Sequence, residues 1–171
     1  MATGALALFF GLRETSDLWV DGLERWWGQV KGGLGHVRRL VVDLDNGPNN
    51  SGRRTQFLKR MVDFADATGL EVRLVYYPPY HSKYNPVERC WSSLEQKWRG
   101  GLLTSLSVIL GYARRMTWCG KPPTVDEITG EYPAGVRLTK SQMKPIEARL
   151  ERSQTLPKYD ITIRPKKPNG G

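Results

Sequence analysis

Hydrophobic and polar positions follow a strand–helix rhythm through the first hundred residues. Apolar runs that end at turn-forming residues predict three strands, at 4–11, 38–45 and 71–77. Apolar residues recur every three or four positions between these runs, which predicts amphipathic helices at 17–30 and 53–68, with a third opening at Asn85. Short strands and helices in alternation are typical of an α/β sandwich with parallel strand pairs.

The pattern becomes less regular beyond Gly101. Residues 102–116 carry enough apolar positions for a helix, whereas 126–135 is predicted to be a loop. Thr139 and Gln142 match a capping box that opens a helix extending to about residue 152.

The C-terminal part is predicted to be an extension of a first domain. Pro145 weakens the helix prediction, because proline removes a backbone donor. Alternating polar and apolar residues at 159–163 predict a short strand, and the basic Pro/Gly-rich end at 164–171 is predicted to be disordered. We therefore expect a first domain at 1–118 and an extension at 119–171.

Composition points to a polyanionic partner. The chain has 26 lysine and arginine residues against 17 aspartate and glutamate residues, a formal net charge of +9. Such an excess favours nucleic acid, because each neutralised phosphate releases counterions. The two cysteines show no zinc-binding spacing, and the N-terminal apolar run is too short to span a bilayer. A cytoplasmic protein without a membrane segment is expected.

Two segments carry the candidate chemistry, VVDLDNGPNN at 41–50 and YYPPYHSKYNPVERCW at 76–91. The first places Asp45 at the end of a strand, and the second places Glu88 just past an Asn-Pro helix start. Ligands gather outside the carboxyl ends of parallel strands, and paired carboxylates suit a divalent metal. Asp43 is a further candidate ligand, because a carboxylate on the buried side of an apolar strand is costly unless it is paired.

Both carboxylates also have structural interpretations, which sequence spacing leaves open. Asn85 as N-cap, with Pro86 and Glu88 after it, resembles a capping box. Asp45 before Asn-Gly is also a common turn signal.

Basic residues near these segments are candidates for DNA contacts. The pairs Arg53-Arg54 and Lys59-Arg60 lie on the second predicted helix, where they form either a solvated face or a phosphate-contacting face. The loop before Glu88 mixes basic and aromatic side chains, which suits nucleic-acid backbones and unstacked bases but also ordinary packing. Its candidates are His81, Lys83 and Tyr84.

The segments VVDLDNGPNN and PPYHSKYNPVERCW resemble the second and third acidic motifs of DDE transposases. The resemblance is to transposases of bacterial insertion sequences of the ISAzo type, which are related to the eukaryotic mariner elements. It continues through RRTQFLKRMVDFAD, LEQKW, MTW and LPKYDITIRP. The resemblance implies an RNase H-like α/β core at 1–118 and an enzyme that cuts and rejoins DNA at transposon ends.

By the same resemblance, Asp45 is the second catalytic carboxylate and Glu88 the third. The implied cofactor is Mg²⁺ or Mn²⁺, with two ions that activate the nucleophile and stabilise the leaving oxygen. The family's first catalytic Asp has no counterpart in the first ten positions of this chain. We therefore expect an N-terminally truncated fold, inactive or nearly so alone, whose partners include a homo-oligomer or a separate N-terminal portion.

Two alternatives to a catalytic transposase component remain open. The first is a non-catalytic DNA-binding and regulatory product of a transposase. The second, an unrelated nucleotide-binding α/β module, is weakened because the sequence has no glycine-rich phosphate-binding loop.

Overall fold

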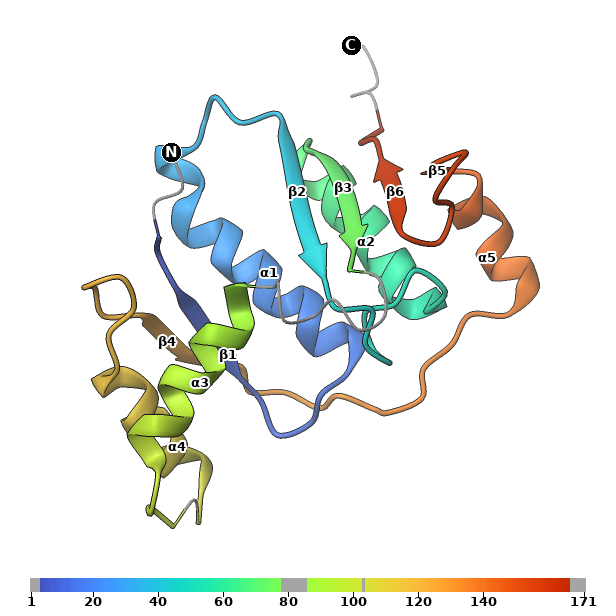
Figure 1. The fold of residues 1–171 in the computed structure, drawn as a ribbon. Helices are drawn as coiled ribbons and strands as arrows, with labels where there is room; N and C mark the ends of the chain where they lie inside the picture. The colour runs from blue at the N-terminus through green and yellow to red at the C-terminus, as the bar shows by residue number, and fades with distance from the viewer. Residues whose placement is uncertain (1–3, 78–85, 103, 167–171) are drawn as a thin grey trace. The chain divides into compact units, whose positions relative to one another are not determined.

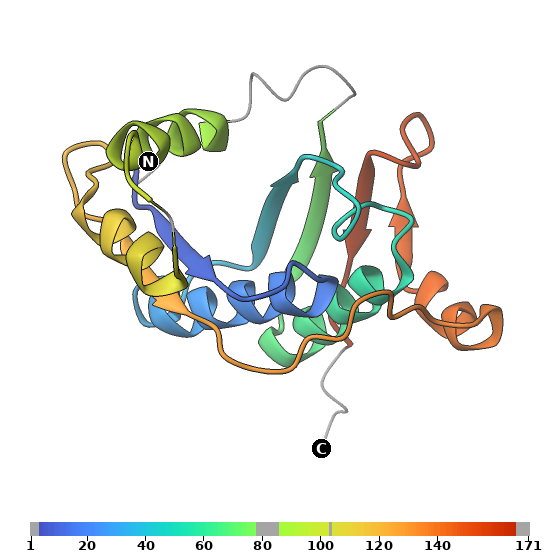
Figure 2. The same cartoon turned by 90° about the horizontal axis from the view of Figure 1, so that it is seen from below.

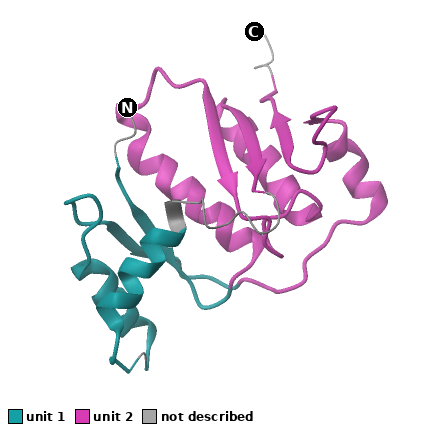
Figure 3. Cartoon of the chain, in the orientation of Figure 1, with its two compact units in different colours: residues 1–13, 80–131 teal, residues 14–79, 132–171 magenta. Residues whose placement is uncertain are grey.

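The computed structural model describes residues 4–77, 86–102 and 104–166 (Figure 1). The chain divides into two compact units, each assembled from two separate stretches (Figure 3). The smaller unit contains residues 1–13 and 80–131, and the larger unit contains residues 14–79 and 132–171. The predicted boundary at 118 falls inside the smaller unit.

A four-stranded mixed sheet is the centre of the larger unit. Its order is β2 (Arg39–Leu44), β3 (Glu71–Tyr76), β6 (Asp160–Ile163) and β5 (Leu150–Arg152). Strands β2 and β3 are parallel, whereas β6 runs antiparallel to both β3 and β5. The carboxyl ends of β2, β3 and β5 and the start of β6 therefore lie at the same end of the strands, which we call the sheet edge.

Two helices cover one face of this sheet (Figure 2). Helix α1 (Ser16–Val30) begins at Thr15, whose side chain accepts a hydrogen bond from the Leu18 N–H. Helix α2 (Thr55–Thr68) ends at Gly69, whose left-handed φ of 71° suits glycine. The predictions at 17–30 and 53–68 are confirmed to within two residues.

The hydrophobic core of the larger unit lies between α2 and the sheet. Alternate strand residues and one stripe of α2 are almost fully buried there. They include Phe57, Leu58, Met61, Phe64, Val72, Leu74, Ile161 and Ile163. This arrangement follows from the period of 2 in the strands and about 3.6 in the helix.

The opposite face of the sheet carries ion pairs. Arg39 bonds Glu71 at 2.5 Å, and Arg73 makes two bonds to Asp160, at 2.6 and 2.9 Å. Arg164 contacts both Glu71 and Glu151. Exposed pairs of this kind add little stability, so this face is held by the apolar packing behind it.

Helix α5 (Lys140–Glu147) confirms the capping box, because the Thr139 and Gln142 groups bond each other's backbone amides. The prediction that this helix continues to residue 152 is wrong, because residues 150–152 form β5. Pro145 withholds one helical donor, and Leu150 is buried beside Ile163 once the chain becomes extended.

The smaller unit pairs β1 (Ala7–Phe10) with β4 (Thr124–Glu127) in parallel. Helices α3 (Pro86–Trp98) and α4 (Leu106–Arg115) complete this unit. Its hydrophobic cluster is formed by the buried residues Leu8, Cys90, Leu94, Ala113 and Met116. The loop predicted from residue 126 is wrong at its start, because Asp126 and Glu127 belong to β4.

The C-terminal predictions are partly confirmed. Strand β6 lies where alternation placed it. Residues 167–171 of the predicted disordered tail lie outside the described residues, whereas the Lys166 amide donates to Asp66 at 2.8 Å. Within the described part of the chain, no helix is both long and apolar enough to cross a membrane.

Two tyrosines of the larger unit give opposite predictions for stability. Tyr76 is 3% exposed, and its hydroxyl has no hydrogen-bond partner among the described residues. An unsatisfied buried polar group costs about 1–3 kcal/mol. We expect Tyr76→Phe to raise the free energy of unfolding by about 1 kcal/mol in urea denaturation.

Tyr132→Phe is the matched control, because the Tyr132 hydroxyl donates to Asp21 at 2.6 Å. Burial, with the neighbouring Asp21, raises the pKa of Tyr132 to about 12. Removing this hydroxyl should lower the free energy of unfolding by about 1 kcal/mol. A destabilising Tyr76→Phe substitution would show that the Tyr76 hydroxyl is hydrogen-bonded.

Candidate functional site

Asp45 directly follows β2 and opens the loop that leads to α2. Its Oδ1 accepts hydrogen bonds from the Gly47 N–H at 3.2 Å and the Asn50 Nδ2 at 2.9 Å. Asn46 adopts a left-handed φ of 63°. The turn interpretation of Asp45-Asn46-Gly47 is therefore confirmed. The side chain remains exposed, with Oδ2 unbonded among the described residues, so turn formation leaves it able to bind a cation.

Asn50 supplies a second oxygen beside Asp45. The residue is 9% exposed, and its Oδ1 has no hydrogen-bond partner among the described residues. A methyl group added at Gly47 would lie 3.3 Å from both Asn50 Oδ1 and Asp45 Oδ1. Both oxygens therefore lie against Gly47, where a larger side chain would crowd them. Carboxylate and amide oxygens are ligands that hard divalent cations accept.

Asp43 lies on the face of the sheet that carries the ion pairs, and its side chain is exposed. The expectation of a buried-side carboxylate is therefore wrong, because the helices cover the other face. Asp43 pairs in register with Val75 of β3, and burial together with the negative charge of Asp43 raises the pKa of Tyr77. Whether Asp43 is a metal ligand stays a prediction.

Glu88 lies in the first turn of α3, where its side chain is exposed. A carboxylate at this position interacts favourably with the helix dipole. The proposed cap Asn85 and the loop candidates His81, Lys83 and Tyr84 lie outside the described residues. Glu88 belongs to the smaller unit and Asp45 to the larger one. No three acidic, histidine or cysteine side chains are gathered into a metal site in the described ranges.

Arg60 is held by carboxylates of α1. Its guanidinium bonds Asp21 at 2.6 Å, Asp17 at 2.8 Å and Glu24 at 3.2 Å. Burial would lower the pKa of Arg60, but these hydrogen bonds raise it above its usual range. The pairing joins α1 to α2, so the guanidinium has a structural role whatever its part in DNA binding.

The other predicted basic contacts on α2 differ from one another. Lys59 bonds Asp63 at 2.5 Å within the helix. Arg54 is half-buried, and its Nε has no partner in the described structure. Arg53 is exposed and forms no ion pair with any described residue. Of these side chains, Arg53 is the most available to a ligand.

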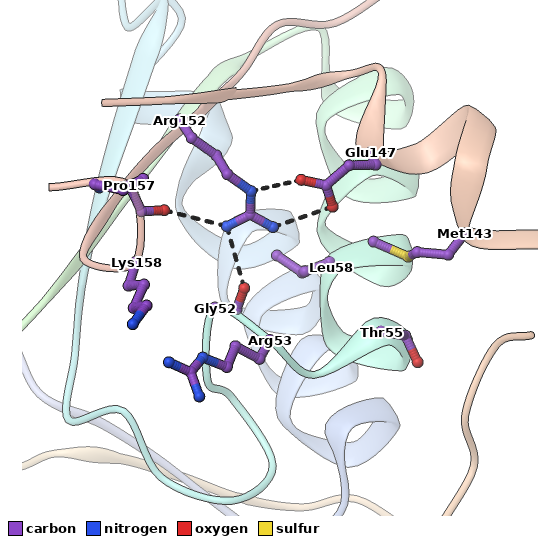
Figure 4. A pocket seen from close by; sticks show the side chains of 9 residues that line it. All are labelled: Gly52, Arg53, Thr55, Leu58, Met143, Glu147, Arg152, Pro157 and Lys158. Atoms are coloured by element: carbon purple, nitrogen blue, oxygen red, sulfur yellow. Dashed lines mark hydrogen bonds and ion pairs between the residues drawn. The ribbon is translucent and has the colours of Figure 1, made fainter. Parts of the chain in front are cut away.

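Arg53 lines a cavity of about 390 Å³ in the larger unit (Figure 4). Sequence reasoning missed two further basic residues of its wall, Arg152 and Lys158. Arg152 bonds both carboxylate oxygens of Glu147, at 2.5 and 3.1 Å. No local motif indicates this cavity, because its walls come from segments about one hundred residues apart.

The mixed α/β fold and the acidic turn after β2 agree with one class of protein, the DDE transposases. The chain matches a family model described as Rhodopirellula transposase DDE domain over residues 2–165, and it therefore belongs to this family. No curated protein and no solved structure matches the chain. The resemblance noted from the acidic motifs is thus confirmed at the level of the DDE transposase domain.

Arg60 and Lys59 provide a matched pair of substitutions on one helix. Arg60→Ala should lower the free energy of unfolding by about 2 kcal/mol, because it leaves partly buried carboxylates unpaired. Lys59→Ala should change it by less than about 0.5 kcal/mol, since its ion pair is exposed. Urea denaturation of both variants checks this, and equal effects would contradict a structural role for Arg60.

Proposed function

We propose that the protein acts in DNA transposition, by metal-dependent cleavage of DNA strands and strand transfer. One observation carries the proposal: in a chain of the DDE transposase family, Asp45 and the orphaned Asn50 oxygen both lie against Gly47, in the turn that follows the carboxyl end of a parallel strand. We also propose that the fold is RNase H-like. The parallel β2–β3 pair, in a sheet that α1 and α2 cover on one face, supports that assignment.

Asp45 and Asn50 are the residues of the larger unit that would hold Mg²⁺ or Mn²⁺. Glu88 is the proposed carboxylate from α3, and Asp43 is a further candidate. A bound metal would supply Lewis-acid chemistry, for activation of a water or 3′-hydroxyl and stabilisation of the leaving oxygen. The Gly47 amide and the Asn50 side chain orient Asp45 through its Oδ1, which leaves Oδ2 free to bind a cation.

The DNA partner is proposed to be the transposon end. The net charge of +9 supports a polyanionic partner. The proposed contacts are Arg53, Arg54, Lys59, Arg60, His81, Lys83 and Tyr84. A homo-oligomer is the proposed protein partner, and the proposed compartment is the cytoplasm.

A second candidate is a non-catalytic DNA-binding or regulatory product derived from a transposase. One observation favours it: the net charge of +9 suits DNA binding, which needs no metal site. We also propose that this chain alone cleaves DNA poorly.

Cation binding tests the proposed site directly. Mn²⁺ titration followed by electron paramagnetic resonance should show binding that Asp45→Asn weakens by at least about tenfold and Asn50→Ala by about tenfold. Asp63→Asn is the control, because this exposed carboxylate bonds Lys59 on the outside of α2. DNA binding by a wild-type protein that has no affinity for Mn²⁺ would favour the non-catalytic candidate.

DNA cleavage tests whether the chain is sufficient. With supercoiled plasmid and Mg²⁺ or Mn²⁺, we expect salt-dependent DNA binding and little or no conversion to open circles. Strong nicking that Asp45→Ala abolishes would show that the chain alone is catalytically sufficient and contradict this prediction. Asp63→Ala serves as the control for loss of one exposed carboxylate.

A further inference from the structure

The cavity that Arg53 lines lies at the same edge of the sheet as Asp45. Strand β2 ends at this edge, and the loop from Asp45 leads to Gly52 and Arg53. Strand β5 ends there at Arg152, and Lys158 comes just before β6. At this edge the Tyr76 N–H donates a hydrogen bond to the Tyr159 carbonyl, at 2.8 Å, which joins the end of β3 to the residue before β6. All of these residues belong to the larger unit.

One wall of the cavity is fixed and electrically balanced. The Arg152 guanidinium bonds the Glu147 carboxylate and also donates to the carbonyl oxygens of Gly52 and Pro157, at 3.3 Å each. Arg53 and Lys158 have no such partner within the described ranges. In Figure 4 both side chains extend away from Arg152 toward the same side of the cavity. Because Glu147 compensates Arg152, the lining of the cavity keeps two positive charges without a partner in the described ranges, those of Arg53 and Lys158.

Gly52 lets the two loops that carry these cations pack closely. A methyl group there would lie 3.0 Å from the Lys158 carbonyl oxygen and 3.2 Å from Ile161 Cδ1. Backbone contact this close is available only to glycine, so the loop that bears Arg53 packs directly on the loop that bears Lys158. The backbones that carry the two cations are therefore packed together before any ligand arrives.

The start of α2 adds to the positive potential. Its N-cap residue, Arg54, forms no side-chain cap, and the helix begins with Thr55 at the cavity wall. Unbonded amide groups and the helix dipole at such a terminus attract anions. The Thr55 Oγ1 accepts the Leu138 N–H at 2.9 Å, which leaves its hydroxyl proton available to a ligand oxygen.

We propose that Arg53, Lys158 and the first turn of α2 bind a backbone phosphate of the DNA strand whose reacting phosphate lies at Asp45. The assignment rests on the proposed function and adds a fixed point for the DNA at the same sheet edge. Positively charged side chains and helix N-termini are the groups that position a duplex through its phosphates. The site is independent of base sequence.

Salt titration of DNA binding tests the proposal. Fluorescence anisotropy with a labelled duplex should show that Arg53→Ala with Lys158→Ala reduces the slope of log K against log salt by about one, and weakens binding about eightfold at 0.1 M salt. The double variant Arg53→Lys with Lys158→Arg keeps both charges and should retain the wild-type slope.

The matched control is Lys31→Ala with Arg38→Ala. These residues line another cavity of about 390 Å³ at the opposite edge of the sheet, near the start of β2. Both alanine pairs remove two charges, so the control measures the general effect of net charge, which should change the affinity less than twofold. Thermal melting establishes that each variant is folded.

The outcomes separate the two proposals. A wild-type protein that binds no DNA would contradict the proposed function itself. DNA binding with equal losses in both alanine pairs would overturn the cavity assignment alone. If the cavity binds free phosphate instead, inorganic phosphate would raise the melting temperature of the wild-type protein but not that of the Arg53→Ala, Lys158→Ala variant. The slope of log K against log salt for DNA would then be the same in both proteins. That result would also overturn the assignment to DNA.

Discussion

The packing of α2 against β3 and β6, with β2 paired in parallel to β3, is the interaction on which the larger unit depends. Phe57, Met61 and Phe64 are fully buried there, and each such side chain contributes about 1.5–3 kcal/mol relative to exposure. This contact also fixes both ends of the loop at 45–54. Asp45 is anchored by β2, and Arg53 is anchored by the start of α2. The positions of the acidic turn and the basic cavity thus follow from the same buried stripe.

Charged residues of the same kind have different roles, according to the partners that the fold gives them. Arg60 joins two helices through Asp17 and Asp21, and Arg152 joins α5 to two loops through Glu147. Arg53 and Lys158 have no such partner among the described residues. A net charge of +9 therefore says less about ligand binding than the few cations that remain unpaired at the sheet edge.

The sequence predicted the parts of the fold in which local periodicity and burial agree. Helices α1 and α2 and strands β2 and β3 have strong periods, and their ends carry clear caps and turns. Strands β4 and β5 were missed because TVDE and LER contain too few apolar residues to show an alternation, whereas DITI of β6 shows one. Asp45 could be placed from its turn, whereas Asp43 was assigned to the wrong face. The cavity was not predictable, because the loops that carry Arg53 and Lys158 are brought together only by the packing of Gly52.

Along the sheet edge, the negative charge of Asp45 and the positive charge of Lys158 lie on opposite sides of β3. Asp45 follows the outer strand β2, while Lys158 precedes β6 on the far side of β3. A polyanion near Asp45 alone would be repelled by that carboxylate, and a bound divalent cation reverses the repulsion locally. Under the proposed function, Arg53 and Lys158, further along the same edge, would attract the neighbouring phosphates without occupying the proposed metal position. Asp45, the group proposed for chemistry, and Arg53, one of the two proposed for positioning, are both carried by the loop between β2 and α2, whereas Lys158 is carried by the loop before β6.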